Sequence, residues 1–345
     1  MVCHHGRMKV LVATHPAFTA HATGLSHPER PARLTAARAG TADAPVDIVE
    51  FSPSEAELEL LAGVHLVDYV QSIKRFCAAG GGQLDPDTVV GVDSWEAALR
   101  AAAAGPDAAN LLERGVADVA FLPIRPPGHH ALEDRAMGFC IFNNVAVTAR
   151  FLAASGNRVA IVDWDVHHGN GTQEMFLMDP EVLYVSLHEF PAYPGSGWVD
   201  EIGLGPAAGT TVNFPMPVGT GGDVYRASFE RVVLPILSAF KPDWLLVSAG
   251  YDAHDADPLA GLSLLESDYA AMGSALRGLV GPGKTILFLE GGYNLKAIQG
   301  CVAATLSGLA AVPVPDETSR PVSGSRSWRA LEFVVEVQQR HWQVV

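Results

Sequence analysis

The chain has 345 residues, of which 48% are hydrophobic and 18% charged, as in an ordinary globular protein. Its 38 acidic and 23 basic residues give a formal net charge of −15, which argues against binding to the nucleic-acid backbone, since that needs clustered Lys and Arg. No apolar run approaches the ~20 residues that span a bilayer or forms a signal peptide, and the four cysteines are scattered, so we expect a cytoplasmic protein without membrane attachment.

Apolar, β-branched runs alternate with helical patterns along the chain. We predict strands at Lys9–Ala13, Val119–Leu122, Val159–Val162, Val182–Leu187, Thr211–Phe214, Leu245–Ser248 and Thr285–Leu289. Helices are predicted mostly between them, at Trp95–Arg114, Asn143–Ala154, Val224–Phe240, Glu266–Val280 and Leu295–Leu309. This alternation predicts a three-layer α/β/α fold, in which an open, mostly parallel sheet carries helices on both faces.

One domain is predicted over residues 8–345, because no linker divides the chain convincingly. Residues 1–7 resemble an extension that precedes a natural start at Met8. A stretch rich in Pro and Ser, residues 312–325, precedes a last helix predicted within 326–341. We expect this helix to pack on the body of the domain or on a second subunit, which would make the protein a homo-oligomer.

The segment Asp163–Gly171, DWDVHHGNG, follows a predicted strand and crowds two carboxylates and two imidazoles into six positions. Side chains alternate along an extended segment, so Asp163, Asp165 and His167 project to one side. Burying so many ionisable groups without a metal or a proton-transfer role would be costly. Oxygen and nitrogen ligands without thiolate suit Zn²⁺, Fe²⁺, Mn²⁺ or Co²⁺. The segment therefore predicts a metal site, and a coordination position left open for water would make it catalytic.

Polar clusters follow five of the predicted strands at their carboxyl ends. In open α/β sheets, sites form in the crevice outside those ends, so we expect the clusters to converge on one site. The clusters are residues 125–130, residues 163–171, His188, Asp252 and residues 290–293.

Among these groups, Asp252 is the natural third metal ligand. His129 and His130 lie on a proline-stiffened loop and resemble a general acid–base pair. Each imidazole needs a partner that fixes its tautomer, and Asp163 is available for one and Asn170 for the other. Because a carboxylate raises imidazole basicity more than an amide does, we expect the two histidines to have unequal pKa values.

Tyr293 follows two glycines that let the backbone turn tightly. A phenol aimed at the metal can donate a hydrogen bond to an oxyanion as it develops. Together the groups suit metal-assisted hydrolysis of an amide. The metal would polarise the carbonyl and activate water, a histidine would take the water proton, and the tyrosine and the metal would share the oxyanion.

The chain resembles zinc-dependent histone deacetylase-type deacylases, and is closest to the class II branch and its bacterial relatives, which include acetylpolyamine amidohydrolases. The resemblance implies the arginase–deacetylase fold and spans about residues 8–309. It rests on seven motifs in the family's order: HPERPARL (27–34), RPPGHHA (125–131), GFCIFNN (138–144), DWDVHHGNGTQ (163–173), YVSLH (184–188), SAGYDAHDADPL (248–259) and EGGYNL (290–295).

The resemblance implies that Asp165, His167 and Asp252 hold Zn²⁺, with Fe²⁺ as an alternative. It implies that His129 and His130 are the catalytic pair, supported by Asp163 and Asn170, and that Tyr293 is the oxyanion donor. It also implies structural K⁺. One K⁺ site would use Asp163, Asp165, His167, Ser186 and Leu187, and a second would use Phe176, Asp179 and Val182.

The resemblance further implies a narrow tunnel for an acyl-lysine stem, with Gly138 and Phe139 on one wall and Tyr193 on the other. Arg33 matches an inner-channel arginine that could hold the leaving acetate. Ser94 is aligned with a residue that accepts the substrate amide.

Three positions distinguish this chain within the family. Tyr193 stands where relatives usually have Phe, which affects the preference for acyl group or stem. Asn170 replaces the Asp of class I relatives and so agrees with class II. Leu259 stands where polyamine-selective members carry Glu, and a leucine cannot attract a second ammonium. The sequence therefore favours an acyl-lysine protein, peptide or small-molecule amide as substrate over an acetylpolyamine.

Three alternatives remain at this stage. An acetylpolyamine amidohydrolase is favoured only by the acidic charge and the shortness of the chain. A binuclear Mn²⁺ ureohydrolase on the same fold would need additional bridging carboxylates. A non-catalytic module that binds acyl ligands would have no use for Tyr293 or for every expected metal ligand.

Overall fold

The apolar runs of the sequence form the centre of one sheet. The computed structural model describes residues 6–24, 26–315 and 321–345. Within them, eight parallel strands are ordered β2-β1-β5-β10-β9-β6-β7-β8. They are β1 (Lys9–Ala13), β2 (Asp47–Phe51), β5 (Val119–Leu122), β6 (Val159–Asp163), β7 (Val182–Glu189), β8 (Thr211–Met216), β9 (Trp244–Ala249) and β10 (Thr285–Leu289). The short strands β3 (Gly82–Gln83) and β4 (Val89–Val90) form a separate antiparallel pair.

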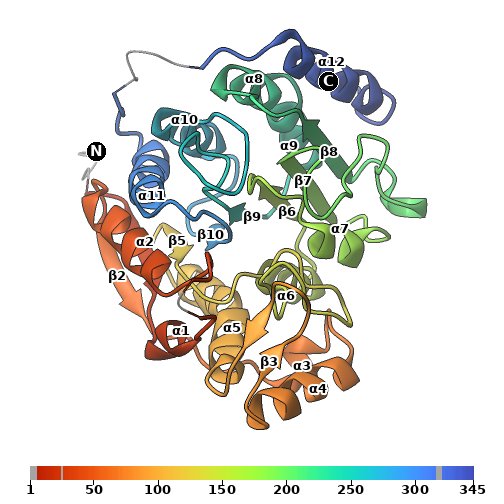
Figure 1. Cartoon of the computed structure of the whole chain (residues 1–345). Helices are drawn as coiled ribbons and strands as arrows, with labels where there is room; N and C mark the ends of the chain where they lie inside the picture. Colours follow the sequence, from red (N-terminus) through yellow and green to blue (C-terminus); the bar gives the residue numbers. More distant parts are fainter. Residues whose placement is uncertain (1–5, 25, 316–320) are drawn as a thin grey trace.

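Helices cover both faces of the sheet (Figure 1). On one side α2, α11, α10 and α8 pack in succession, and on the other α5 and α6 pack on each other and on the sheet. The helices are α1 (Pro16–Ala20), α2 (Ala32–Asp43), α3 (Leu58–Leu61), α4 (Val67–Ala78), α5 (Ser94–Glu113), α6 (Asn144–Ala154), α7 (Asn170–Phe176), α8 (Gly222–Ser228), α9 (Leu234–Phe240), α10 (Glu266–Leu276), α11 (Leu295–Leu309) and α12 (Ser325–Gln338). None of these helices in the described ranges is long and apolar enough to cross a membrane.

This architecture confirms the predicted three-layer α/β/α fold. All seven predicted strands are present, each with ends within two residues of the prediction. Six strands, β5 to β10, are buried along their whole length because helices cover both of their faces, which explains their continuous apolar sequences. The edge strand β2 was missed, since its sequence DIVEF is mostly exposed or half-buried and lacks a clear apolar pattern.

The predicted helix Val224–Phe240 is not uniform. It consists of α8, a π-helical turn at Phe229–Val233, and α9. Pro235 lies at the start of α9, has no N–H group, and its ring conflicts with the carbonyl four residues earlier, so the widened turn accommodates it. The predicted helix Glu266–Val280 is also shorter, because α10 ends at Leu276, just before Gly278 with φ of +78°.

The last helix, α12, packs against the edge strand β8 and against α8. It begins one residue before the predicted range and ends at Gln338. Its position protects an edge strand that would otherwise offer unpaired backbone groups. The single domain over residues 8–345 and the homo-oligomer stay predictions, and residues 1–5 of the predicted extension lie outside the described residues.

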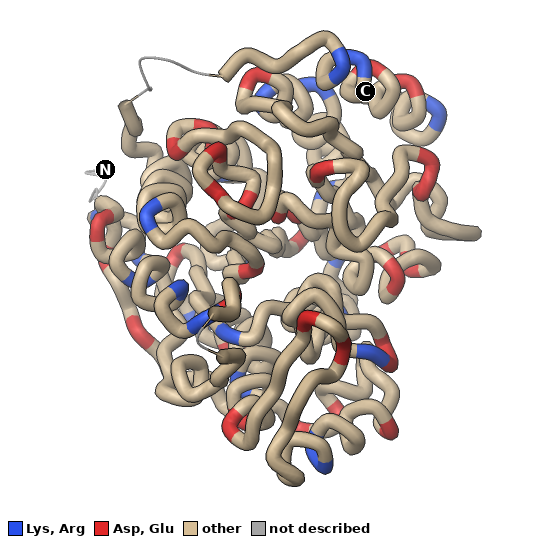
Figure 2. Tube along the Cα trace, in the orientation of Figure 1, with Lys and Arg blue, Asp and Glu red and all other residues tan. Residues whose placement is uncertain are grey.

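The acidic residues are not gathered on one face. Figure 2 shows them on many elements, both at the periphery and near the centre of the view. The net charge of −15 is thus spread over the molecule, as expected of charge that serves solubility.

Helices α10 and α11 approach closely at two glycines. A Cβ on Gly308 would overlap with the carbonyl oxygen of Ala270, and a Cβ on Gly273 would lie 2.5 Å from the carbonyl oxygen of Thr305. Both obstacles are backbone atoms, which cannot rotate away as a side chain can. The crossing therefore requires glycine at both positions.

We predict that Gly308→Ala lowers the free energy of unfolding by about 1–3 kcal/mol, because overpacking forces the two helices apart. Urea denaturation measures the change. Gly281→Ala is the matched control, since nothing lies within 4 Å of its added Cβ. Equal stability of the Gly308→Ala variant and the wild type would contradict the close crossing.

Candidate metal centre and active site

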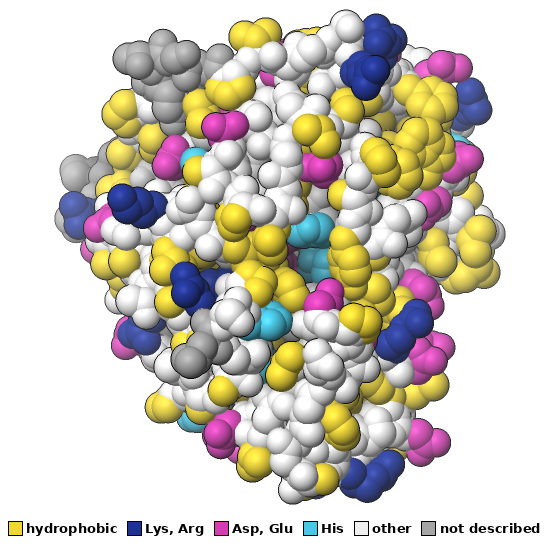
Figure 3. All heavy atoms as spheres, viewed as in Figure 1, with side chains coloured by type: hydrophobic (Ala, Val, Ile, Leu, Met, Phe, Trp, Pro, Cys, Tyr) yellow, Lys and Arg dark blue, Asp and Glu magenta, His cyan; other side chains and the backbone are white. Residues whose placement is uncertain are grey.

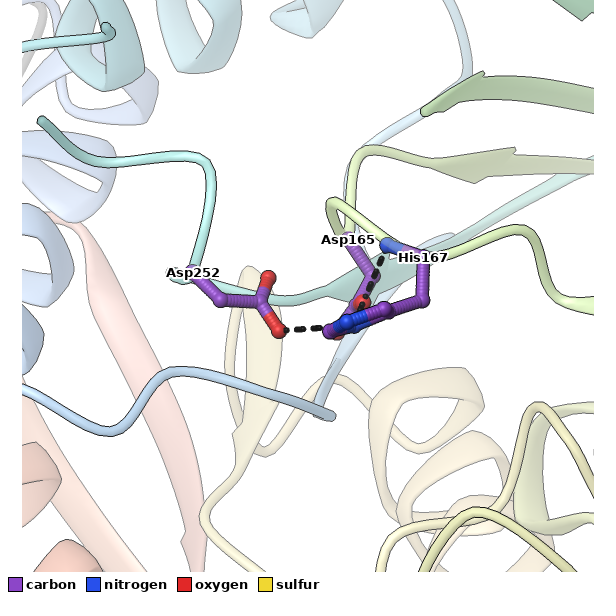
Figure 4. Close-up of side chains that lie close together, drawn as sticks. All are labelled: Asp165, His167 and Asp252. Atoms are coloured by element: carbon purple, nitrogen blue, oxygen red, sulfur yellow. Dashed lines mark hydrogen bonds and ion pairs between the residues drawn. The ribbon is translucent and has the colours of Figure 1, made fainter. Parts of the chain in front are cut away.

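Two aspartates and one histidine meet at the carboxyl edge of the sheet. Asp165 and His167 follow β6, and Asp252 follows the neighbouring strand β9. One ligand atom from each residue lies within 4.8 Å of the others (Figure 4). His167 Nδ1 is 3.3 Å from both Asp165 Oδ1 and Asp252 Oδ2. The three predicted ligands are therefore brought together, with oxygen and nitrogen donors that suit Zn²⁺ or Fe²⁺.

The hydrogen bonds around this group leave one ligand atom unpaired. Asp252 Oδ1 accepts from Val166 N at 2.9 Å, and Asp165 Oδ2 accepts from Gly291 N at 2.6 Å. Asp252 Oδ2 is buried and accepts no hydrogen bond within the described part of the chain. A buried carboxylate oxygen without a donor is costly, and a cation would satisfy it. The residues present therefore fit a divalent metal.

Two glycines leave room for these ligands. A Cβ on Gly250 would overlap with the carboxylate of Asp165, and a Cβ on Gly291 would overlap with that of Asp252. The backbone of both neighbouring strand ends thus passes directly beside the ligand carboxylates. This explains why glycines follow β9 and β10 in the sequence.

The ionisable side chains of the group shift the pKa values of one another. Burial, and after it the neighbouring Asp165 charge, raise the pKa of Asp252. Burial lowers the pKa of His167, but hydrogen bonds and charge from Asp165 and Asp252 outweigh it and raise that pKa to about 10. The histidine proton thus compensates the two carboxylates where a metal ion would do so.

His129 and His130 lie beside this group on the loop after β5. Their ring centroids are 4.0 Å apart. His129 Nδ1 is 3.0 Å from Asp163 Oδ2, and His130 Nδ1 is 2.8 Å from Asn170 Oδ1. The structure thus gives each imidazole the partner that the sequence analysis assigned to it.

The two imidazoles differ in basicity. Burial lowers the pKa of His129, but the charges of Asp163, Asp165 and Glu290 and the hydrogen bond to Asp163 together outweigh it and raise that pKa to about 10. Burial, followed by the charge of His129, lowers the pKa of His130 well below its usual range. The unequal pKa values follow the expected difference between a carboxylate and an amide partner.

Glu290 holds the histidine loop and was not identified as a site residue from the sequence. Its Oε2 accepts from Gly128 N at 2.7 Å and from His129 N at 3.2 Å, and its Oε1 accepts from Ser248 Oγ at 3.3 Å. Burial raises the pKa of Glu290 to about 7. Its position directly after an apolar strand is the feature of the sequence from which its place in the site could have been predicted.

Tyr293 stands next to the metal group on the loop after β10. Its ring packs edge-on against Phe139, with centroids 5.9 Å apart, and the Arg33 guanidinium lies 5.1 Å from its centroid. Burial, and after it the Asp252 charge, raise the pKa of Tyr293 well above its usual range, so the phenol keeps its proton. It therefore can serve as a hydrogen-bond donor.

Two of the proposed tunnel residues, Tyr193 and Gly138, lie against the histidines of the site. Figure 3 shows histidine atoms at the bottom of a hollow near the centre of this face, with hydrophobic side chains around it. Tyr193 is 39% exposed, and its ring packs edge-on against His130 and His167, at 5.1 and 6.2 Å. Gly138 has φ of +55°, and a Cβ there would overlap with the ring of His130. Leu259 is 44% exposed.

One substrate-binding prediction, that for Ser94, does not agree with the structure. Ser94 is fully buried at the start of α5, where its Oγ is 2.7 Å from His21 Nδ1 and accepts from Gly91 N, so the structure does not bring it to the hollow. Thr88, which the sequence analysis missed, lies beside the tunnel wall instead, since its Oγ1 accepts from Phe139 N at 3.0 Å.

Arg33 is buried and bonded to the protein. It donates to Glu29 Oε1, to Gly292 O and to Glu290 O. These bonds fix the turn that carries Tyr293. These three protein acceptors already occupy the guanidinium. The role of Arg33 in holding acetate stays a prediction.

The residues predicted to hold K⁺ fall into two places. In the first, Ser186 on β7 pairs in register with Asp163 on β6, next to Asp165, His167 and Leu187. In the second, Phe176 ends α7, Val182 begins β7, and the Asp179 carboxylate is 2.7 Å from Arg150 Nη1. An ion at this second place would depend on backbone oxygens.

Comparison with known proteins agrees with this geometry. The model of the histone deacetylase domain matches residues 27–309. Histone deacetylase 15 of Arabidopsis thaliana is 40% identical over 319 residues, which cover 90% of this chain and 57% of that protein. A probable deacetylase of Archaeoglobus fulgidus is 36% identical, over 87% of this chain and 85% of that protein. The crystal structure of the HDA15 HD domain superposes with a TM-score of 0.89 at 36% identity, over 97% of this chain and 96% of that one. This likeness confirms the expected arginase–deacetylase fold.

We predict that binding of a divalent metal releases about one proton or more per site at neutral pH, because the metal-free His167, with its pKa raised to about 10, must lose its proton. Metal affinity should accordingly rise as the pH rises toward 10. Calorimetric titration with Zn²⁺ in buffers of different ionisation enthalpy counts the protons.

In this titration Asp252→Asn should bind Zn²⁺ far more weakly. The exposed Asp200→Asn variant should bind it as the wild type does. Binding without proton release, or unchanged binding by Asp252→Asn, would contradict the assignment of the ligands.

Proposed function

The chain belongs to the histone deacetylase family, and from that premise we propose that it is a metal-dependent deacylase that hydrolyses the amide of a lysine-like amine carrying an acetyl or another short acyl group. The observation that carries the proposal is the buried Oδ2 of Asp252, which, among the described residues, accepts no hydrogen bond and has only His167 Nδ1, 3.3 Å away, as an ion-pair partner. A structural role alone would not leave this atom unsatisfied.

Asp165, His167 and Asp252 would hold Zn²⁺, or Fe²⁺ in its place. When bound, such an ion polarises the substrate carbonyl and makes water a better nucleophile at neutral pH. The potassium sites remain part of the proposal, as does the choice between the two metals.

His130 is the proposed general base. Its lowered pKa keeps it neutral, and with Nδ1–H donating to Asn170 Oδ1 its free lone pair lies on Nε2. This nitrogen takes a proton from the attacking water and returns it to the amine nitrogen as the C–N bond breaks. His129, held as an imidazolium by Asp163, provides positive charge beside the reacting carbonyl.

Tyr293 is the proposed donor to the oxyanion. Its phenol is protonated, and its position between Phe139 and Arg33 fixes the ring. A donor held in place before the reaction stabilises the negative charge that develops on the carbonyl oxygen.

The substrate stem is proposed to pass between Phe139 and Tyr193. Their aromatic faces suit a methylene chain, and the exposed side chain of Leu259 is uncharged. These features favour an acylated lysine, in a protein, a peptide or a small molecule, over an acetylpolyamine. Cytoplasmic location stays a prediction from the sequence, and two similar plant histone deacetylases are chloroplastic by name.

We predict that Tyr293→Phe lowers kcat on an acetyl-lysine peptide by about 10²–10³-fold and changes KM little, because the lost donor acts on the developing oxyanion. Tyr269→Phe removes a hydroxyl from a buried tyrosine of α10 and is the matched control, with activity retained. Full activity of the Tyr293→Phe variant, or of the wild type after removal of the metal by a chelator, would contradict the proposal.

We predict that the wild type prefers an acetyl-lysine peptide to acetylspermidine, and that Leu259→Glu shifts this preference toward acetylspermidine by up to about fivefold in kcat/KM. The estimate reflects the modest energy of an exposed ion pair. Leu259→Gln, of equal length but uncharged, should leave the ratio of the two substrates near that of the wild type. A wild-type preference for acetylspermidine would favour the polyamine alternative instead.

A further inference from the structure

One buried carboxylate joins the loop after β9 to the loop after β10. Asp257 lies on the first loop, five residues after Asp252. Its Oδ2 accepts from Tyr293 N at 2.7 Å and from Asn294 N at 3.1 Å, and its Oδ1 accepts from Leu259 N at 3.1 Å. The same side chain therefore fixes the backbone of the proposed oxyanion donor and that of the exposed Leu259.

The carboxylate of Asp257 has no ion-pair partner within the described residues. Its negative charge is stabilised by three backbone N–H groups, while burial raises its pKa to about 6. A buried carboxylate without a cation is costly, so its hydrogen bonds to the backbone must offset the burial. Charged acceptors form the stronger hydrogen bonds, which suits a side chain that must fix backbone positions.

The backbone of the turn is fixed from two sides. Arg33 Nε donates to Gly292 O at 2.6 Å, just before Tyr293, and Asp257 accepts from the N–H groups of Tyr293 and of the next residue. Asn294 Nδ2 adds a bond to Ala256 O at 2.9 Å. Of these contacts, the two to Asp257 Oδ2 are the ones that hold the N–H side of the turn at Tyr293.

We propose that Asp257 is a positioning residue that holds Tyr293 where its phenol meets the substrate carbonyl. This inference rests on the proposed function for its effect on turnover. Asp257 itself does not contact the reacting atoms, and its influence passes through the backbone N–H bonds to Tyr293. Loss of the carboxylate should therefore reduce the contribution of the tyrosine and leave the metal ligands in place.

A double-mutant cycle tests the inference in the zinc-loaded full chain. We expect Asp257→Ala to lower kcat on an acetyl-lysine peptide by about ten- to hundredfold, with little change in KM and in zinc content. In the Tyr293→Phe background the same substitution should lower kcat by less than about threefold, because Tyr293 no longer contributes. An equal loss in both backgrounds, or a loss of zinc, would overturn the positioning role.

Two further variants refine the cycle. Asp257→Asn should recover most of the activity, since its amide oxygen can still accept from Tyr293 N and Asn294 N. Asp255→Ala, on the same loop but with an exposed side chain, is the matched control and should behave as the wild type. If Asp257→Ala does not fold, Asp257→Ser takes its place, because a hydroxyl is too short to span the gap.

Hydrogen exchange provides a readout that does not need activity. The amides of Tyr293 and Asn294 should exchange roughly ten- to hundredfold faster in Asp257→Ala than in the wild type or in Asp255→Ala. Unchanged exchange overturns the inference whatever the turnover. Faster exchange in a protein whose wild type hydrolyses no acyl-lysine substrate would instead overturn the proposed function and leave the structural link intact.

Discussion

Buried negative charge at one edge of the sheet is the constraint on which the rest of the structure depends. Asp163, Asp165 and Asp252 are fully buried at the ends of two neighbouring strands, and Glu290 is buried at the end of a third. Carboxylates so close together in a low dielectric repel one another unless positive charge or N–H groups compensate them. Most of the groups around the site provide this compensation.

The compensation comes from three sources. Imidazoles supply positive charge, at His129 beside Asp163 and, as long as no metal displaces its proton, at His167 beside Asp165. Backbone N–H groups supply further donors, and glycines such as Gly250 and Gly291 let the backbone approach closely enough to provide them. Asp252 Oδ2 accepts no hydrogen bond from any residue that the structure describes, which points to a metal ion as the third source. The groups that compensate the buried charge are thus the same groups that the proposed hydrolysis uses.

The sequence alone predicted those parts of the molecule whose signal is local. Buried parallel strands have continuous apolar runs, and so β5 to β10 were recognised. The grouping of Asp165, His167 and Asp252 was predicted because polar residues directly after such strands must share one edge of the sheet. The pairing of His129 with Asp163 and of His130 with Asn170 followed from the need of each imidazole for a partner.

Features that depend on contacts between distant segments could not be predicted in this way. Ser94 was aligned with a substrate contact, yet it is buried against His21, 73 positions away in the sequence. Thr88 and Asp257 accept hydrogen bonds from backbone N–H groups. Any residue except proline has such a group, so the sequence does not reveal which residue will be the partner. The exposed edge strand β2 and the π-helical turn before Pro235 were missed or misjudged for similar reasons.

The central claim is that Asp165, His167 and Asp252 bind one divalent cation in common. Anomalous diffraction from crystals of the zinc-loaded protein, recorded on both sides of the zinc absorption edge, tests it most directly. The account predicts a single strong peak at about 2.0–2.2 Å from one atom of each of the three side chains. The claim would be contradicted by a zinc peak at another place. It would also be contradicted by fully bound zinc in a structure in which these three side chains point away from one another.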